Sequence, residues 1–66
     1  MKGKIYRKFM LPKDPVLLLS YINMKLRDQY ESLDALCDDL DADKGEIMDT
    51  LARIDYQYDE AQNQFK

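Results

Sequence analysis

The stretch that decides the fold is CDDLDADKGEIMDTL, Cys37–Leu51, in which aspartates alternate at positions 39, 41 and 43 and a glycine follows at 45. This spacing fits either a calcium-binding loop or the tight turn between the two helices of a helix-turn-helix. The first structure would make the protein a metal sensor, and the second would make it a recognition module. The neighbouring residues decide between them.

A calcium loop that begins at Asp39 fails at two required positions. Such loops need oxygen ligands at positions 1, 3 and 5, glycine at position 6 and a bidentate glutamate at position 12. Lys44 stands where the glycine is needed, and Thr50, which has no carboxylate, stands where the glutamate is needed. The aspartates are better explained as turn formers and as favourable charges at a helix start. We therefore expect no metal and no other cofactor.

Apolar residues at helical spacing flank the Asp-rich stretch on both sides. They are Leu33, Leu36, Cys37 and Leu40 before it, and Ile47, Leu51 and Ile54 after it. Ser32 is placed to cap the first of these helices, and Asp43 and Glu46 have the spacing of a capping box at the start of the second. Asp41 tolerates the left-handed geometry of a tight turn, and Ala42 is small enough to fit inside it. The pattern favours a helix-turn-helix.

A longer helix is predicted upstream, beginning at Asp14 as N-cap and Pro15 as first helical residue. Its core stripe is Leu18, Leu19, Ile22 and Leu26. After residue 54 the period changes, because Tyr56 and Tyr58 alternate and a polar turn leads to Phe65, which predicts a β-hairpin.

The expected fold is mainly α with a small C-terminal β-hairpin, a three-helix helix-turn-helix or miniature winged-helix-like domain. A basic N-terminal arm occupies 1–12, and a single domain occupies 13–66, with helices at about 14–29, 32–40 and 43–54 and the hairpin at about 55–66. The alternative is a plain helical bundle with a disordered tail.

Composition excludes several classes of chemistry. With 66 residues, one cysteine and no histidine, the chain has no intrachain disulfide, no Cys/His zinc site and no Ser-His or Cys-His catalytic pair. Three short helices enclose little volume for a cleft that perturbs carboxyl or phenol pKa values, so we expect no enzyme. The unpaired cysteine and the lack of a long apolar run predict a cytoplasmic protein outside the membrane.

Charge is distributed unevenly along the chain. Residues 1–27 carry seven of the ten basic residues but one of the thirteen acidic residues. Candidate nucleic-acid contacts are Lys4, Arg7, Lys8, Lys25, Lys44 and Arg53. The acidic residues around the expected recognition helix would repel phosphates, so nucleic acid is the disfavoured partner. The alternative is that the basic arm keeps the protein soluble or neutralises its acidic half.

The predicted elements leave more apolar surface than this core needs. A candidate interaction surface consists of Leu17, Tyr21, Met24, Tyr56, Tyr58 and Phe65. Either the hairpin and arm fold back over the first helix, or this surface contacts another protein. We expect a non-enzymatic module that acts through protein–protein contacts, with a homodimer or an unknown protein as partner. The alternative function is a nucleic-acid-binding regulator that uses the helix-turn-helix or the basic arm.

Four segments carry a resemblance to a known family. They are LPKDP at 11–15, N-x-KLRD at 23–28, SLDALCDDLDADKGEI at 32–47 and IDYQYDEAQNQF at 54–65. From about Met10 to Phe65 the chain resembles a family of short bacterial proteins known only as a domain of unknown function. The resemblance implies a bacterial cytoplasmic protein without an established activity.

The second of these segments contains a candidate polar contact site. Asn23 and Arg27 are four residues apart on one flank of the first helix, near Tyr30. Arg27 could pair with an aspartate of the second helix while Asn23 bonds to a loop backbone. Alternatively, the three residues bind a carboxylate or phosphate of a partner.

Overall fold

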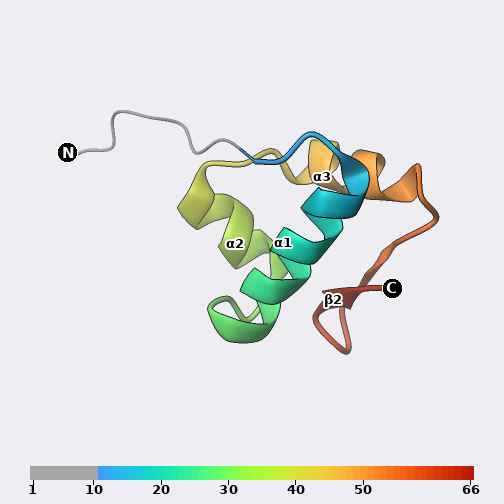
Figure 1. Cartoon of the computed structure of the whole chain (residues 1–66). Helices are drawn as coiled ribbons and strands as arrows, with labels where there is room; N and C mark the ends of the chain where they lie inside the picture. Colours follow the sequence, from blue (N-terminus) through green and yellow to red (C-terminus); the bar gives the residue numbers. More distant parts are fainter. Residues whose placement is uncertain (1–10) are drawn as a thin grey trace.

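A computed structural model of the chain describes residues 11–66, so the N-terminal arm predicted for 1–12 lies outside the described residues except for its last two positions (Figure 1). The elements are α1 (Pro15–Asp28), α2 (Leu33–Leu40), α3 (Lys44–Ala52), β1 (Tyr58–Asp59) and β2 (Gln64–Phe65). This arrangement confirms the predicted mainly helical fold with a small C-terminal hairpin. Each helix begins one residue later than predicted, immediately after its N-cap.

Side-chain oxygens cap the N-termini of all three described helices. Asp14 Oδ2 accepts a hydrogen bond from the Leu17 amide at 3.2 Å, and Ser32 Oγ accepts one from the Ala35 amide at 3.0 Å. Asp43 Oδ1 accepts one from the Glu46 amide, also at 3.2 Å. Each cap satisfies a backbone N–H that has no partner within its own helix. The start of each helix is therefore fixed by a local signal that is visible in the sequence.

Three residues connect α2 to α3. Asp41 is the C-cap of α2, with φ 55° and ψ 44°, and it provides the left-handed geometry predicted for the turn. The Ala42 amide donates to the Cys37 carbonyl at 2.9 Å, which closes the last turn of α2. Asp43 then caps α3. The sharp turn is therefore built from local backbone geometry and side-chain capping.

The α3 helix ends two residues earlier than predicted. After Ala52 the chain turns, with Asp55 at φ 65°, and the Tyr56 amide donates to the Leu51 carbonyl at 3.0 Å. Ile54 still packs against the core, but from this turn and not from the helix. This early end allows the chain to reverse and carry the hairpin back beside α1.

The hairpin is a two-stranded antiparallel sheet in which Tyr58 pairs with Phe65 and Asp59 pairs with Gln64. Next to this pairing, the Gln57 and Lys66 backbones exchange two hydrogen bonds of 3.1 and 3.0 Å. In the loop, Asp59 Oδ1 accepts from the amides of Ala61 and Gln62. These bonds make an Asx-type turn without the Asn-Gly or Asp-Gly sequence of the commonest hairpins.

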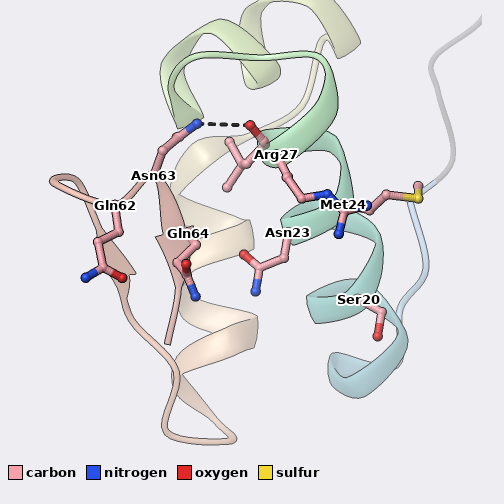
Figure 2. A pocket seen from close by; sticks show the side chains of 8 residues that line it. Ser20, Asn23, Met24, Arg27, Gln62, Asn63 and Gln64 are labelled. Atoms are coloured by element: carbon pink, nitrogen blue, oxygen red, sulfur yellow. Dashed lines mark hydrogen bonds between the residues drawn. The ribbon is translucent and has the colours of Figure 1, made fainter.

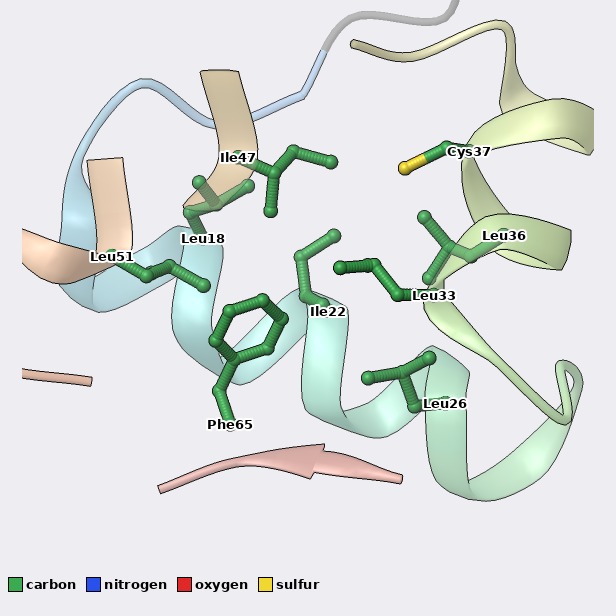
Figure 3. Close-up of a cluster of buried hydrophobic side chains, with 9 residues drawn as sticks. All are labelled: Leu18, Ile22, Leu26, Leu33, Leu36, Cys37, Ile47, Leu51 and Phe65. Carbon is green, nitrogen blue, oxygen red and sulfur yellow. The ribbon is translucent and has the colours of Figure 1, made fainter. Parts of the chain in front are cut away.

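The core receives side chains from α1, α2, α3 and β2 (Figure 3). Its buried members are Leu18, Ile22, Leu26, Leu33, Leu36, Cys37, Ile47, Leu51 and Phe65. Leu19, Leu40 and Ile54, which the sequence placed in the core, are partly buried at its margin. None of the described polar or charged residues is buried. Hydrophobic packing is therefore the main force that holds the helices together.

Candidate functional site

The outer face of α1 carries exposed apolar side chains. Leu17 is 60% exposed, Val16 is 59% exposed and Met24 is 43% exposed. Leu17 and Met24 are seven residues apart, so they lie on the same side of the helix, opposite the buried line of Leu18 and Ile22. We call Val16, Leu17 and Met24 the outer apolar face. Two of its members belong to the predicted interaction surface.

The other four members of the predicted interaction surface are less accessible. Phe65 is 1% exposed and lies inside the core, so its placement on an exposed surface was wrong. Tyr21, Tyr56 and Tyr58 are partly buried and pack against the same core. The hairpin folds back against α1, which is one of the two arrangements that the sequence left open for these residues.

Tyr58 and Asn63 link the hairpin to the helices through side-chain hydrogen bonds. The Tyr58 hydroxyl donates to Asn63 Oδ1 at 2.6 Å and accepts from the Leu33 amide at 3.2 Å. Asn63 Nδ2 donates to the carbonyls of Leu26 at 3.0 Å and Tyr30 at 2.9 Å, and the first of these bonds is drawn in Figure 2. The end of α1, the start of α2 and the hairpin therefore meet at one polar cluster.

Sequence reasoning did not identify Asn63. It falls in a segment that reads only as a polar turn, and its partners lie 33 and 37 residues away. Its backbone has φ 55°, a conformation that asparagine adopts more readily than most residues. An asparagine directly before the final strand was therefore the available signal for a left-handed turn position, although not for its partners.

Asn23 makes two reciprocal hydrogen bonds with the backbone of Phe65. Its Oδ1 accepts from the Phe65 amide at 2.8 Å, and its Nδ2 donates to the Phe65 carbonyl at 3.0 Å. The side-chain amide thus satisfies both backbone groups of the strand residue whose ring enters the core. Asn23 therefore bonds to the backbone of β2, whereas the first of its two predicted roles was a bond to a loop backbone.

The three residues of the predicted polar contact site do not converge on one point. Arg27 Nε pairs with Asp28 Oδ1 at 2.9 Å on its own helix, not with an aspartate of α2. The Tyr30 hydroxyl donates to Asp39 Oδ2 at 2.5 Å. This bond, together with some desolvation and the negative charge of Asp39, raises the pKa of Tyr30 to about 12. Asn23, Arg27 and Tyr30 therefore serve three separate contacts.

A polar groove of about 610 Å³ runs between α1 and the hairpin (Figure 2). Its lining residues are Ser20, Asn23, Met24, Leu26, Arg27, Gln62, Asn63 and Gln64. The amides of Asn23 and Asn63 are already occupied by backbone partners. The groove adjoins the outer apolar face at Met24. It is therefore a polar groove at the border of an exposed apolar face.

The candidate nucleic-acid contacts fall into two groups. Lys4, Arg7 and Lys8 lie outside the described residues. Among the described candidates, Lys44 Nζ pairs with Asp34 Oδ1 at 2.8 Å, and Lys25 Nζ donates to Gln29 Oε1 and lies 5.4 Å from the Tyr21 ring centroid. Arg53 lines a groove beside α3 together with Asp41, Asp43, Glu46 and Asp49. Acidic side chains therefore accompany the basic ones along α3.

Each aspartate of the alternating stretch has a local structural role. Asp39 accepts the hydrogen bond from Tyr30, Asp41 supplies the left-handed turn residue, and Asp43 caps α3. Within residues 11–66, no group of three or more His, Cys, Asp or Glu side chains is arranged to hold a metal ion. The contact from Tyr30 accounts for Asp39, and the turn between α2 and α3 accounts for Asp41 and Asp43.

Cys37 is 8% exposed and packs in the core. Burial raises the pKa of its thiol, and the nearby Asp34 acts in the same direction. Because the thiolate is the reactive form, this thiol is poorly suited to nucleophilic chemistry. Cys37 is a packing residue.

No helix in the described part of the chain has the length and apolar character needed to span a bilayer.

Comparison with known protein families gives a match, whereas comparison with individual proteins does not. No curated protein and no solved structure is detectably similar to the chain. A sequence model of the family described as a domain of unknown function, DUF4250, matches residues 12–65, which include all three helices and both strands. The chain therefore belongs to the DUF4250 family.

Proposed function

We propose that this protein is a small, non-enzymatic module that acts through protein–protein contacts and associates with a second copy of itself through the outer apolar face of α1. The observation that supports the proposal is the exposure of Leu17 and Met24, at 60% and 43%, on a helix whose opposite side already fills the core. Burying a fully exposed side chain of this type contributes about 1.5–3 kcal/mol, so the exposed parts of Leu17 and Met24 on each of two copies provide a driving force for association.

The surroundings of this face support a contact between proteins. The polar groove beside Met24 supplies side-chain amides, a hydroxyl and the Arg27 guanidinium around an apolar centre. An apolar centre with a polar rim is the usual composition of a protein interface. A twofold dimer brings the same patch of both copies together, and Met and Leu side chains adapt readily to such self-complementary packing.

Sedimentation equilibrium of the full chain tests the proposal. We expect a reversible monomer–dimer equilibrium, which the double variant Leu17→Ser, Met24→Ser shifts to monomer without loss of helical circular dichroism. Met48→Ser is the matched control, because Met48 is 40% exposed but lies on α3. This control should dimerise like the unaltered chain. A monomer at high micromolar concentration, or equal weakening by the control, would contradict the proposal.

A further inference from the structure

A second groove, of about 1100 Å³, lies on another side of the molecule, between the segment before α1 and the face of α3. Leu11, Pro12 and Ala42 contribute partly buried apolar surface to it, and the nearly buried Leu18 and Ile47 lie at its floor. We call it the α3 groove. It does not include Leu17 or Met24, so it is separate from the outer apolar face.

The rim of the α3 groove carries a negative charge. Its acidic members are Asp41, Asp43, Glu46 and Asp49, and its basic members are Lys13 and Arg53. All six of these residues are exposed. A groove with an apolar floor and an acidic rim is complementary to an extended segment that combines cationic and apolar side chains.

The chain itself contains such a segment. Residues 2–9, KGKIYRKF, hold four basic residues and no acidic residue, with Ile5, Tyr6 and Phe9 between the charges. The described chain begins at Leu11, which is itself part of the groove wall. An eight-residue segment can extend about 26–29 Å, whereas the nine residues of α3 extend about 13.5 Å, so the segment is long enough to follow the rim.

We propose that the α3 groove is the docking surface for residues 2–9 of the same chain. Lysine and arginine side chains contact the acidic rim, and the aromatic side chains contact Leu11, Pro12 and Ala42. Attachment at Leu11 keeps the segment at a local concentration in the millimolar range, which favours contact within one chain over contact between two at lower protein concentration. The basic segment then neutralises the acidic side of α3.

Paramagnetic relaxation in the full chain tests the docking. A spin label is attached through Gly3→Cys, where the added thiol is labelled selectively because Cys37 is buried. We expect the amide signals of residues 45–49 to lose most of their intensity and those of residues 62–64 to keep theirs. The contrast should disappear in about 1 M salt, where the Debye length falls to about 3 Å.

Two matched variants of the labelled chain sharpen this test. Glu46→Gln with Asp49→Asn removes two rim charges, and we expect it to restore the signals of residues 45–49. Glu31→Gln with Glu60→Gln removes the same charge from exposed sites that do not line the groove, and we expect it to leave the broadening in place. Circular dichroism verifies that both variants keep their helices.

Three outcomes would overturn the docking proposal. The first is unbroadened signals for residues 45–49, and the second is an equal response of the two charge variants. The third comes from a mixture of two chains, one with the isotope label only and the other with the spin label only. If the isotope-labelled chain shows the same broadening, the segment docks on a second copy. The result does not depend on dimerisation through the outer apolar face, since the two surfaces share no residue.

Discussion

The hairpin and the α2–α3 turn are both short, irregular and rich in polar residues, but they are stabilised differently. The turn is fixed by local contacts, since Asp41 and Asp43 act on amides and carbonyls at most four residues away. The hairpin is fixed by distant contacts, because Asn23 and Asn63 join it to α1 across 37 to 42 residues and Phe65 fills the core. Local capping contributes modest stability, whereas long-range packing determines whether the hairpin joins the helices and closes the core.

Phe65→Ala should have the largest effect on the stability of the fold. Truncating a buried phenylalanine costs about 3–5 kcal/mol, and a chain of this size has a total stability of roughly 3–10 kcal/mol. We therefore expect urea denaturation to show that the variant is largely unfolded without urea or unfolds at low urea concentration. Met48→Ala, on exposed surface, should change the free energy of unfolding by less than about 0.5 kcal/mol. A stable Phe65→Ala variant would contradict the dependence of the fold on the hairpin.

Asn63→Gly isolates the polar link between the hairpin and α1. Glycine accepts the φ of 55° without strain, so the loss comes from the hydrogen bonds to Leu26, Tyr30 and Tyr58. Leaving part-buried groups unpaired should cost about 1–3 kcal/mol in urea denaturation. Gln62→Gly in the same turn is the control, and it should cost less, because Gln62 is exposed. Equal losses would show that only backbone entropy had changed.

Asp43→Ala tests the local side of the comparison and should cost about 1 kcal/mol, the usual effect of removing an N-cap. Asp43→Ser keeps a side-chain acceptor for the Glu46 amide and should retain most of the stability. Thermal unfolding followed by circular dichroism measures both variants. A serine variant that loses as much as the alanine variant would mean that capping does not stabilise this turn.

The contact between Tyr30 and Asp39 should have the smallest effect, confined to alkaline solution. The pKa of Tyr30 is raised to about 12, above its ordinary value of 10.0, so folding favours the protonated hydroxyl. The contribution of this hydrogen bond to the free energy of unfolding is therefore present below about pH 10 and is lost as the pH rises through 12. Phenolate absorbance should show Asp39→Asn lowering this pKa, with Tyr30→Phe identifying the signal. An unchanged pKa in Asp39→Asn would remove the assigned cause.

The parts of the fold that the sequence predicts correctly are the parts determined by neighbours. Asp14, Ser32 and Asp43 are recognisable as caps because a cap acts within three residues of itself. The left-handed Asp41 is likewise a consequence of its place between two amphipathic helices. Helix starts and the turn between α2 and α3 were therefore predictable from spacing alone.

The contacts of the hairpin were less predictable, for a physical reason. Each strand has two residues, so alternation gives too few positions to decide which side faces the core. Phe65 was therefore assigned to the surface although it is buried. Among the candidate site residues, Leu17 and Met24 are exposed, on the side of α1 that the helical period places opposite the core, although the sequence left open whether the hairpin and arm would cover them.

The paired bonds between Asn23 and Phe65 have a consequence for aggregation. A two-stranded sheet has two edges whose unpaired backbone groups can recruit strands from other molecules. On the β2 edge, the Asn23 amide occupies both the N–H and the carbonyl of Phe65, the positions that an incoming strand would need. The Asn23 side chain thus occupies the groups through which a strand would add at the edge packed against α1, so we expect substitution of Asn23 to increase aggregation as well as to lower stability.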